Sequence, residues 1–294
     1  ALMKIIIKNE ATAGVAMVME VKTGKIKAIA NLGKISEGVY REDLNYAMTP
    51  TEPGSTFKLV TLLSALEDGK VTLNSRVNLE GGTWNVAGQT VYDSEKHGKF
   101  DASVLEAFEE SSNVGMAKIA MANYTNNVDV YFKHLTKLRL DSTSGIDLVG
   151  EKQPRIVKPG NKIWGPTTLP WMAFGYNIAI APIQTLNLYN MVANNGVMMR
   201  PYLVNSIQEE GRIIKTISPK VYNAQVYSPA TIKAAQIALE GVCINGTGKT
   251  LFKNSPYKVA GKTGTALVAN GNKGYADKIY QSSFAGYFPA DNPQ

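Results

Sequence analysis

Ser55 and Lys58 are the residues whose types and spacing most directly suggest chemistry. They lie in the run Pro53-Gly54-Ser55-Thr56-Phe57-Lys58-Leu59-Val60, whose apolar character continues to Leu66. Residues three apart share one face of a helix, so the hydroxyl and the amine could meet. A helix that is apolar on all sides is buried, and burial favours the neutral form of lysine. A neutral amine beside a hydroxyl is a general base beside a nucleophile, and the Ser55 N–H at the helix N-terminus is free to bind an oxyanion.

The Ser-x-x-Lys pattern alone is weak evidence. At average residue frequencies, a chain of this length contains it about once by chance. Ser255-Pro256-Tyr257-Lys258 also matches. That copy enters a predicted strand, where positions i and i+3 point to opposite faces, so we expect no catalytic pair there.

Two further motifs carry side chains that would complement a nucleophile. Ser111-Ser112-Asn113 is the only Ser-x-Asn in the chain; it could cap the helix that begins near Val114, or supply a proton-relaying hydroxyl and an amide for a substrate carbonyl. Lys262-Thr263-Gly264-Thr265 lies in an apolar predicted strand, where Gly264 leaves room for another backbone. There Lys262 and Thr265 would offer a cation and a hydroxyl to a carboxylate. The other Lys-Thr-Gly, at 22–24, is predicted to be a hairpin turn.

Other chemistries have little support in the sequence. The only histidines, His97 and His134, are far apart, and neither HExxH nor CxxC occurs, so we expect no metal and no cofactor. Cys243 has no partner for an intrachain disulfide. Gly246-Thr247-Gly248-Lys249-Thr250 resembles a phosphate-binding loop, but the required first glycine falls at Cys243. Gly261-Lys262-Thr263 fails the same test at Pro256.

Composition indicates a folded domain with a mildly basic surface. The 294 residues are 44% hydrophobic and 19% charged, and the net charge of +7 is scattered along the chain, so we expect no nucleic-acid partner. No stretch approaches the ~18 apolar residues of a membrane span. Both ends resemble cuts through a larger protein.

The order of the predicted elements indicates an α+β fold. An N-terminal hairpin precedes several helices, two strands come last, and we expect the first and last strands to share one sheet. In the last strand, the even spacing of Tyr280, Phe284 and Phe288 predicts an aromatic face in the core. The predicted hairpin strands are 15–21 and 26–30, the helices 55–66, 103–110, 113–122, 127–137, 182–193 and 229–241, and the late strands 258–268 and 278–288, joined by a loop at 269–274.

Taken in order, the three motifs occur as a set in serine β-lactamases and penicillin-binding proteins. The chain resembles the transpeptidase domain of class B (monofunctional) penicillin-binding proteins along nearly its whole length, and the Ser-Ser-Asn-Val-Gly run is most similar to the septal, cell-division branch. Many members have Gln-Gly where this chain has Tyr176-Asn177, so we assign that pair no role. Further similar stretches are 14–30, 53–58, 174–176, 182–184, 259–266 and 284–289.

The resemblance implies a penicillin-binding and serine β-lactamase-like fold, with an antiparallel sheet flanked by helices plus a mainly helical subdomain. Residues 1–294 would be one transpeptidase domain, without the family's N-terminal membrane anchor and pedestal and without its last strand and helix, which would leave a sheet edge unpaired. The catalytic domain would lie in the periplasm or otherwise outside the cytoplasmic membrane.

The resemblance also implies a role for each motif residue. Ser55 would attack the penultimate carbonyl of a D-Ala-D-Ala stem peptide while Lys58 takes its proton. Ser111 and Lys262 would return the proton to the leaving group. The remaining roles are an oxyanion hole made by the N–H groups of Ser55 and Thr265, and substrate binding by Asn113, Thr263, Gly264 and Thr265.

The implied partners are peptidoglycan stem peptides on lipid-linked precursors, β-lactam antibiotics, and membrane proteins of a division complex, including a glycosyltransferase. Alternatives remain open at this point. A D,D-carboxypeptidase or a β-lactamase of the same fold would use water as the acceptor. A non-catalytic β-lactam sensor would form the acyl adduct but never release product, and a purely structural domain would form no adduct.

Overall fold

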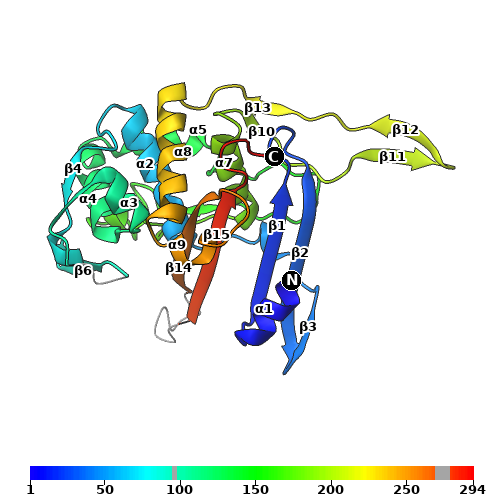
Figure 1. Cartoon of the computed structure of the whole chain (residues 1–294), viewed down its shortest axis with the longest axis horizontal. Coiled ribbons are helices and arrows are strands. Elements are labelled where there is room, and N and C mark those ends of the chain that lie inside the picture. The colour runs from blue at the N-terminus through cyan, green and yellow to red at the C-terminus, as the bar shows by residue number, and fades with distance from the viewer. Residues whose placement is uncertain (95–97, 269–278) are drawn as a thin grey trace.

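The computed structural model describes residues 1–94, 98–268 and 279–294, so the predicted loop at 269–274 lies outside them (Figure 1). The helices are α1 Leu2–Lys8, α2 Lys58–Glu67, α3 Val104–Glu109, α4 Asn113–Tyr124, α5 Val128–Lys137, α6 Thr168–Met172, α7 Pro182–Ala193, α8 Pro229–Ile244 and α9 Lys249–Phe252, with 3₁₀ turns η1 Tyr46–Met48, η2 Gly54–Phe57 and η3 Glu80–Gly82. The strands are β1 Ala13–Met19, β2 Ile26–Ser36, β3 Val39–Arg41, β4 Arg76–Asn78, β5 Thr83–Val86, β6 Gln89–Tyr92, β7 Asp101–Ser103, β8 Arg155–Ile156, β9 Ile178–Ala179, β10 Met198–Met199, β11 Ser206–Glu209, β12 Arg212–Thr216, β13 Val221–Asn223, β14 Ala260–Val268 and β15 Ile279–Tyr287. All the predicted helices and strands are present, with bounds close to those expected.

Helix α2 is the centre of the largest hydrophobic core. Every residue from Lys58 to Ala65 is buried, and the helix packs against α4, α5 and α8. It ends where Asp68-Gly69 predicts, because Gly69 adopts the left-handed conformation and the Lys70 N–H donates to the Ala65 carbonyl. The all-round apolar sequence of this segment therefore has the consequence that was expected, a buried helix.

The strands form separate small sheets, so the prediction that the first and last strands share one sheet is wrong. β1, β2 and β3 form one antiparallel sheet, whereas within the described residues β14 and β15 pair only with each other. Figure 1 shows β14–β15 between the helices and the β1–β2 pair. An apolar alternation predicts that a segment is a strand, but it carries no information about which strand lies beside it.

The predicted aromatic core face of β15 is also wrong. Tyr280 and Phe284 are 61% and 42% exposed, and Phe288 just beyond the strand is 55% exposed. The opposite face points inward, where Tyr287 is only 6% exposed and the strand packs against α7. Even spacing places side chains on one face of a strand without saying which face meets the core.

One hairpin stands apart from the rest of the molecule. β11 and β12 pair with each other and project outward (Figure 1). Ile213 and Ile214 are 61% and 59% exposed, so the hairpin adds little to the core. None of the helices in the described part of the chain combines the length and the apolar character that crossing a bilayer requires.

Candidate active site

Ser55 and Lys58 lie where the 3₁₀ turn η2 runs directly into α2. Ser55 is 7% exposed and Lys58 is completely buried. In a 3₁₀ turn residues i and i+3 are aligned on one face, so the sequence places the two side chains on the same side. Across the described residues, no hydrogen bond joins the Ser55 hydroxyl to another group.

The Lys58 amine donates its hydrogen bonds to Ser111. One goes to the Ser111 Oγ at 3.0 Å, and a shorter one goes to the Ser111 carbonyl oxygen. Ser111 lies in the turn between α3 and α4 with φ at 60°, a left-handed conformation that costs a non-glycine residue roughly 1 kcal/mol or more. Strained residues of this kind cluster at functional sites. The structure thus brings together Lys58 and Ser111, which are 53 residues apart.

The other two residues of Ser111-Ser112-Asn113 begin helix α4. Ser112 is the N-cap, since its Oγ accepts from the Gly115 N–H at 2.9 Å, which confirms that this motif caps a helix. The Asn113 side-chain amide donates to the Tyr92 carbonyl at 2.6 Å. Asp93 accepts hydrogen bonds from the Ser112 hydroxyl at 2.8 Å and from the Asn113 N–H at 2.5 Å. A carboxylate at a helix N-terminus is favourable there, so Asp93 holds the Ser111 turn in place.

Strand β14 presents the Lys262-Thr263-Gly264-Thr265 motif beside η2. Lys262 is completely buried and donates to the Thr263 carbonyl at 3.1 Å. A Cβ on Gly264 would lie 3.0 Å from the Thr56 methyl group, so the absence of a side chain allows the close approach that the sequence predicted. A Cβ on Gly54 would lie 2.9 Å from the Thr265 carbonyl oxygen, which places Thr265 next to the Ser55 segment.

Burial shifts the pKa values of both lysines downward. Burial is the main cause for Lys58, whose pKa lies well below its ordinary value; the charge of Lys262 lowers it further, while Asp93 acts in the opposite direction. Burial lowers the pKa of Lys262 to about 7, with Cys243 acting in the opposite direction. An amine of this kind can be neutral near neutral pH, which is what a lysine general base requires.

A loop from another part of the chain supports η2 and reaches β14. Gly175, with φ at 97°, packs directly against the backbone of Gly54, and the Gly54 N–H donates to the Gly175 carbonyl at 3.3 Å. The Tyr176 hydroxyl accepts from the Leu267 N–H at 3.1 Å. Tyr176, to which the sequence assigned no role, therefore ties this loop to the strand that carries the lysine motif.

The sequence analysis did not predict two of the residues that the structure places at the site. Asp93 and Thr247 have no motif of their own, and their partners lie far along the chain. The Thr247 and Thr263 hydroxyls are 2.6 Å apart. Thr247 belongs to the run at 246–250 that resembles a phosphate loop, and this run joins α8 to α9. The only available signal was this cluster of glycines and threonines, which was considered for a different chemistry.

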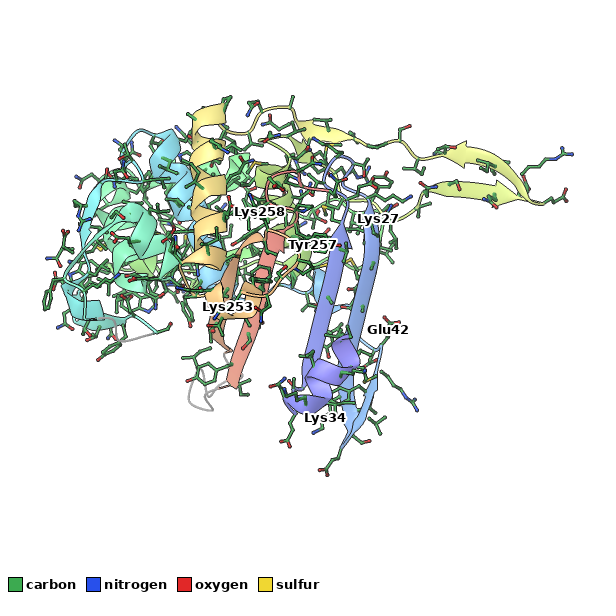
Figure 2. The ribbon with its side chains drawn as sticks, in the orientation of Figure 1. Lys27, Lys34, Glu42, Lys253, Tyr257 and Lys258 are labelled. Carbon is green, nitrogen blue, oxygen red and sulfur yellow. The ribbon has the colours of Figure 1, made fainter. Side chains whose placement is uncertain are left out.

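The second Ser-x-x-Lys does not form a comparable pair. Lys258, labelled in Figure 2, has a 66% exposed side chain that faces Asp291 at 3.7 Å. The Ser255 hydroxyl donates to the Tyr257 carbonyl at 2.8 Å. The segment lies before β14 and not inside it as expected, and its lysine is solvated, in contrast to the buried Lys58.

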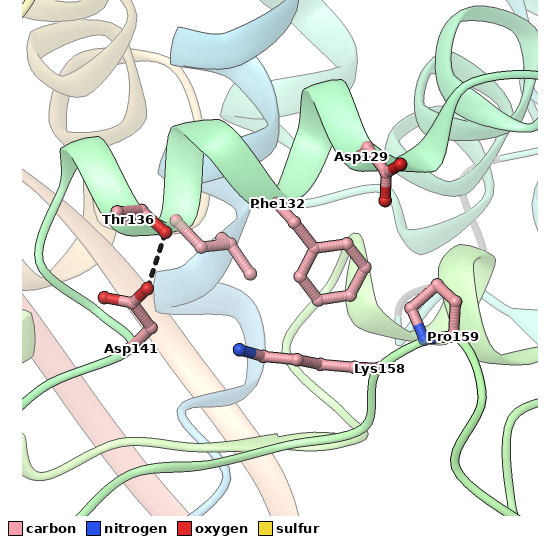
Figure 3. A pocket seen from close by; sticks show the side chains of 7 residues that line it. Asp129, Phe132, Thr136, Asp141, Lys158 and Pro159 are labelled. Carbon is pink, nitrogen blue, oxygen red and sulfur yellow. Dashed lines mark hydrogen bonds between the residues drawn. The ribbon is translucent and has the colours of Figure 1, made fainter.

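A cavity elsewhere in the described structure contains none of the predicted site residues. A cavity of about 200 Å³ lies between α5 and the loop at 158–159, lined by Phe132, Lys158 and two aspartates (Figure 3). One of these, Asp141, accepts a hydrogen bond from Thr136 at 2.5 Å. Over residues 1–94, 98–268 and 279–294, no group of three or more histidine, cysteine, aspartate or glutamate side chains could hold a metal ion.

Comparison with known proteins identifies the family. Residues 14–294 match the model of the penicillin binding protein transpeptidase domain. The chain is 31% identical to stage V sporulation protein D of Bacillus subtilis, over 95% of this chain and 43% of that protein. It is 27% identical to peptidoglycan D,D-transpeptidase FtsI of Escherichia coli, over 97% of this chain and 46% of that protein. The chain thus spans less than half the length of these two relatives.

Solved structures agree with this result. The apo transpeptidase domain of penicillin-binding protein 3 from Burkholderia pseudomallei matches with a TM-score of 0.81 and 27% identity, over 99% of this chain and 80% of that one. Penicillin-binding protein 3 of Mycobacterium tuberculosis complexed with aztreonam matches with a TM-score of 0.80 and 27% identity, over 98% and 66%. The fold is therefore that of penicillin-binding transpeptidase domains, and the chain belongs to the penicillin-binding protein transpeptidase family.

Proposed function

We propose that this chain is the catalytic domain of a D,D-transpeptidase that cross-links peptidoglycan stem peptides through an acyl-enzyme on Ser55. The observation that carries the proposal is the completely buried Lys58 amine, one helical turn from Ser55 and hydrogen-bonded to Ser111. Membership of the transpeptidase family supports it, and so does the name of the Escherichia coli relative.

In the first step, the Ser55 oxygen attacks the penultimate carbonyl carbon of the D-Ala-D-Ala end, and neutral Lys58 takes the hydroxyl proton. The negative oxygen of the tetrahedral intermediate is bound by the N–H groups of Ser55 and Thr265. Their closeness is supported by the short approach of Gly54 to the Thr265 carbonyl. Removing one such donor typically costs about 3 kcal/mol of transition-state stabilisation.

In the second step, the C–N bond to the terminal D-alanine breaks and its nitrogen receives a proton. The Lys58 amine is hydrogen-bonded to Ser111, so the proton passes from Lys58 through the Ser111 hydroxyl to the leaving nitrogen. Lys262 supplies the positive charge that favours this transfer. Asn113 orients the acyl amide. Thr263 and Thr265 bind the terminal carboxylate, and Gly264 allows η2 to lie against the strand.

In the last step, an amine from a neighbouring stem peptide attacks the acyl-enzyme, releasing Ser55 and forming the cross-link. A β-lactam presents a strained amide and a carboxylate with the same spacing as the dipeptide, so it acylates Ser55. The amine acceptor is what separates this function from a carboxypeptidase or a β-lactamase, where water takes its place.

The cellular setting follows from the same proposal. The substrate is a peptidoglycan precursor, so the domain acts outside the cytoplasmic membrane as part of a membrane-anchored protein. The Ser-Ser-Asn-Val-Gly run at 111–115 favours the septal branch, whose partners are division-complex membrane proteins, including a glycosyltransferase.

Intact-mass spectrometry after exposure to benzylpenicillin tests the nucleophile. We expect a single adduct on the unmodified chain, no adduct on Ser55→Ala, and acylation slowed by roughly 10² to 10⁴ in Lys58→Ala, since the general base is lost. Ser255→Ala and Lys258→Ala form the matched control pair and should react normally. An adduct that persists on Ser55→Ala would rule out Ser55, and unchanged acylation of Lys58→Ala would rule out Lys58 as the base.

A second assay identifies the acceptor. A stem-peptide donor is supplied with and without a D-amino acid amine. A cross-linked or exchanged product supports the transpeptidase, whereas hydrolysis alone supports the carboxypeptidase. Rapid turnover of the penicillin, rather than a stable adduct, would support a β-lactamase, and a stable adduct without any peptide product would support a sensor.

A further inference from the structure

Thr247 contacts the Lys262-Thr263-Gly264-Thr265 motif on β14, although it belongs to none of the three motifs found in the sequence. Its hydroxyl lies 2.6 Å from that of Thr263, and both side chains are only partly buried, so a ligand can reach them. Each hydroxyl has one proton, and at this separation one of the two must donate to the other. The direction of this bond decides whether the Thr263 proton is available to a ligand.

The loop that carries Thr247 is fixed by its backbone. The Thr247 N–H donates to the Glu109 carbonyl at 3.2 Å, and the Gly248 N–H donates to the Val242 carbonyl at 2.9 Å. Gly246 lies so close to the Glu109 carbonyl that no side chain could occupy its place. Thr247 is therefore anchored to the residue that lies two positions before Ser111.

The side chain of Glu109 strengthens the same anchor. Glu109 is 7% exposed, its carboxylate packs against Gly241, and it accepts from the Asn245 side-chain amide at 3.3 Å. The turn that holds Ser111 and the loop that holds Thr247 are thus joined by backbone and side-chain contacts. Thr247 then links this assembly to Thr263 on β14.

We propose that Thr247 is a positioning residue for the carboxylate subsite: its hydroxyl donates to Thr263 Oγ1 and so directs the Thr263 proton toward the carboxylate of the substrate. The inference rests on the proposed function, in which Thr263 binds that carboxylate. The Thr263 carbonyl already accepts from Lys262, so the hydroxyl is the polar group of this residue that a ligand would use. Hydrogen bonds in a chain polarise one another, so a hydroxyl that accepts one bond donates a stronger one.

The test compares a ligand that has the carboxylate with one that lacks its charge. Acylation rate constants are measured by intact mass for benzylpenicillin and for its methyl ester, on the unmodified chain and on Thr247→Val. We expect Thr247→Val to lower the ratio of the two constants, acid over ester, by about fivefold, the effect of one ordinary hydrogen bond. Thr247→Ser, which keeps the hydroxyl, should restore most of the ratio. Thr250→Val, an exposed threonine in the same segment, should leave it unchanged.

Three results would overturn the inference. Equal slowing with the acid and the ester would show that the hydroxyl pair only supports the loop, and unchanged rate constants for both ligands would show that Thr247 has no part in carboxylate binding. If valine prevents folding, Thr247→Ala provides the same comparison. On a Thr263→Val background, Thr247→Val should cause no further loss, and an additive loss would also contradict the proposal. Failure of the proposed function is separate, because then the unmodified chain itself forms no adduct.

Discussion

Lys58 and Lys262 are two completely buried amines, and the charge of Lys262 makes Lys58 harder to protonate. Two positive charges repel strongly where little solvent reaches them, so the site favours the state in which only one of the two amines is protonated. In the proposed mechanism, Lys58 is neutral when it takes the Ser55 proton, and Lys262 carries the charge that faces an anionic substrate. The same chemical group thus has two roles, set by its neighbours.

The acylation rate should therefore depend on pH through both amines. The pKa of Lys262 is about 7, so the rate constant for acylation by benzylpenicillin should fall as the pH rises above about 7 and the cation is lost. It should fall again toward acid as Lys58 becomes protonated. A bell-shaped profile of the rate constant against pH, which reports the free enzyme, is the expected measurement.

Lys262→Arg isolates the alkaline limb, because arginine keeps its charge across the accessible pH range. In this variant we expect the fall above about pH 7 to disappear. The same alkaline limb in Lys262→Arg would assign it to another group, and a flat profile in the unmodified chain would contradict a functional cation at Lys262.

Residues with a motif could be found from the sequence, whereas residues that act through tertiary contacts could not. Ser55 and Lys58 lie in one helical turn, so spacing alone predicts their shared face. Asp93 reaches the N-terminus of α4 from a different strand–loop segment, and Thr247 reaches Thr263 across the turn after α8. No periodicity connects such pairs, so a single sequence contains no signal for them.

Among the elements, the turn at Gly175 shows how backbone fit supports the site. Gly175 has φ at 97°, and a Cβ there would collide with the backbone of Gly54, immediately before Ser55. A side chain would thus meet both an unfavourable conformation and a rigid obstacle. The position of η2, and with it that of Ser55, depends on the absence of this one side chain.

Gly175→Ala should destabilise the fold by about 2 kcal/mol or more and slow acylation by roughly 10²-fold, because η2 must move. The free energy of unfolding and the acylation rate constant are the two measurements. Gly88→Ala is the matched control, since Gly88 also has a positive φ, of 77°, but open space around it. This control should lose some stability and keep its acylation rate; equal rates in both variants would contradict the role given to Gly175.

Local structure could be predicted for the elements, but their partners could not. The hairpin of β1 and β2 was expected because its strands are joined by a short turn. β15 was expected as a strand. Which of its faces points inward depends on its packing against α7, and its strand partner is β14 and not β1. These are properties of the assembled core, which a pattern along one strand does not contain.

For the whole molecule, the projecting β11–β12 hairpin is expected to be dispensable for acylation. Its two ends meet where the Ile217 N–H donates to the Asn205 carbonyl at 2.9 Å, so residues 206–216 can be replaced by a Gly-Gly linker. The acylation rate should stay within about twofold and stability should change little, since exposed residues away from the core contribute little. A large loss of acylation, measured by intact mass, would connect the hairpin to the site.

The buried lysines also bear on how the chain resists heat. Lys58→Met is one atom shorter and has no group that must lose its hydration, so the melting temperature should rise even though the hydrogen bonds to Ser111 are lost. The folded-state pKa of Lys58 lies below that of the unfolded chain, so the unfolded state binds the extra proton and the unmodified protein gains stability as pH rises between the two values. The advantage of methionine should therefore shrink toward alkaline pH, and a lower melting temperature at every pH would contradict this. In the proposed mechanism, the buried amine is retained for catalysis, although an apolar side chain in its place would give a more stable fold.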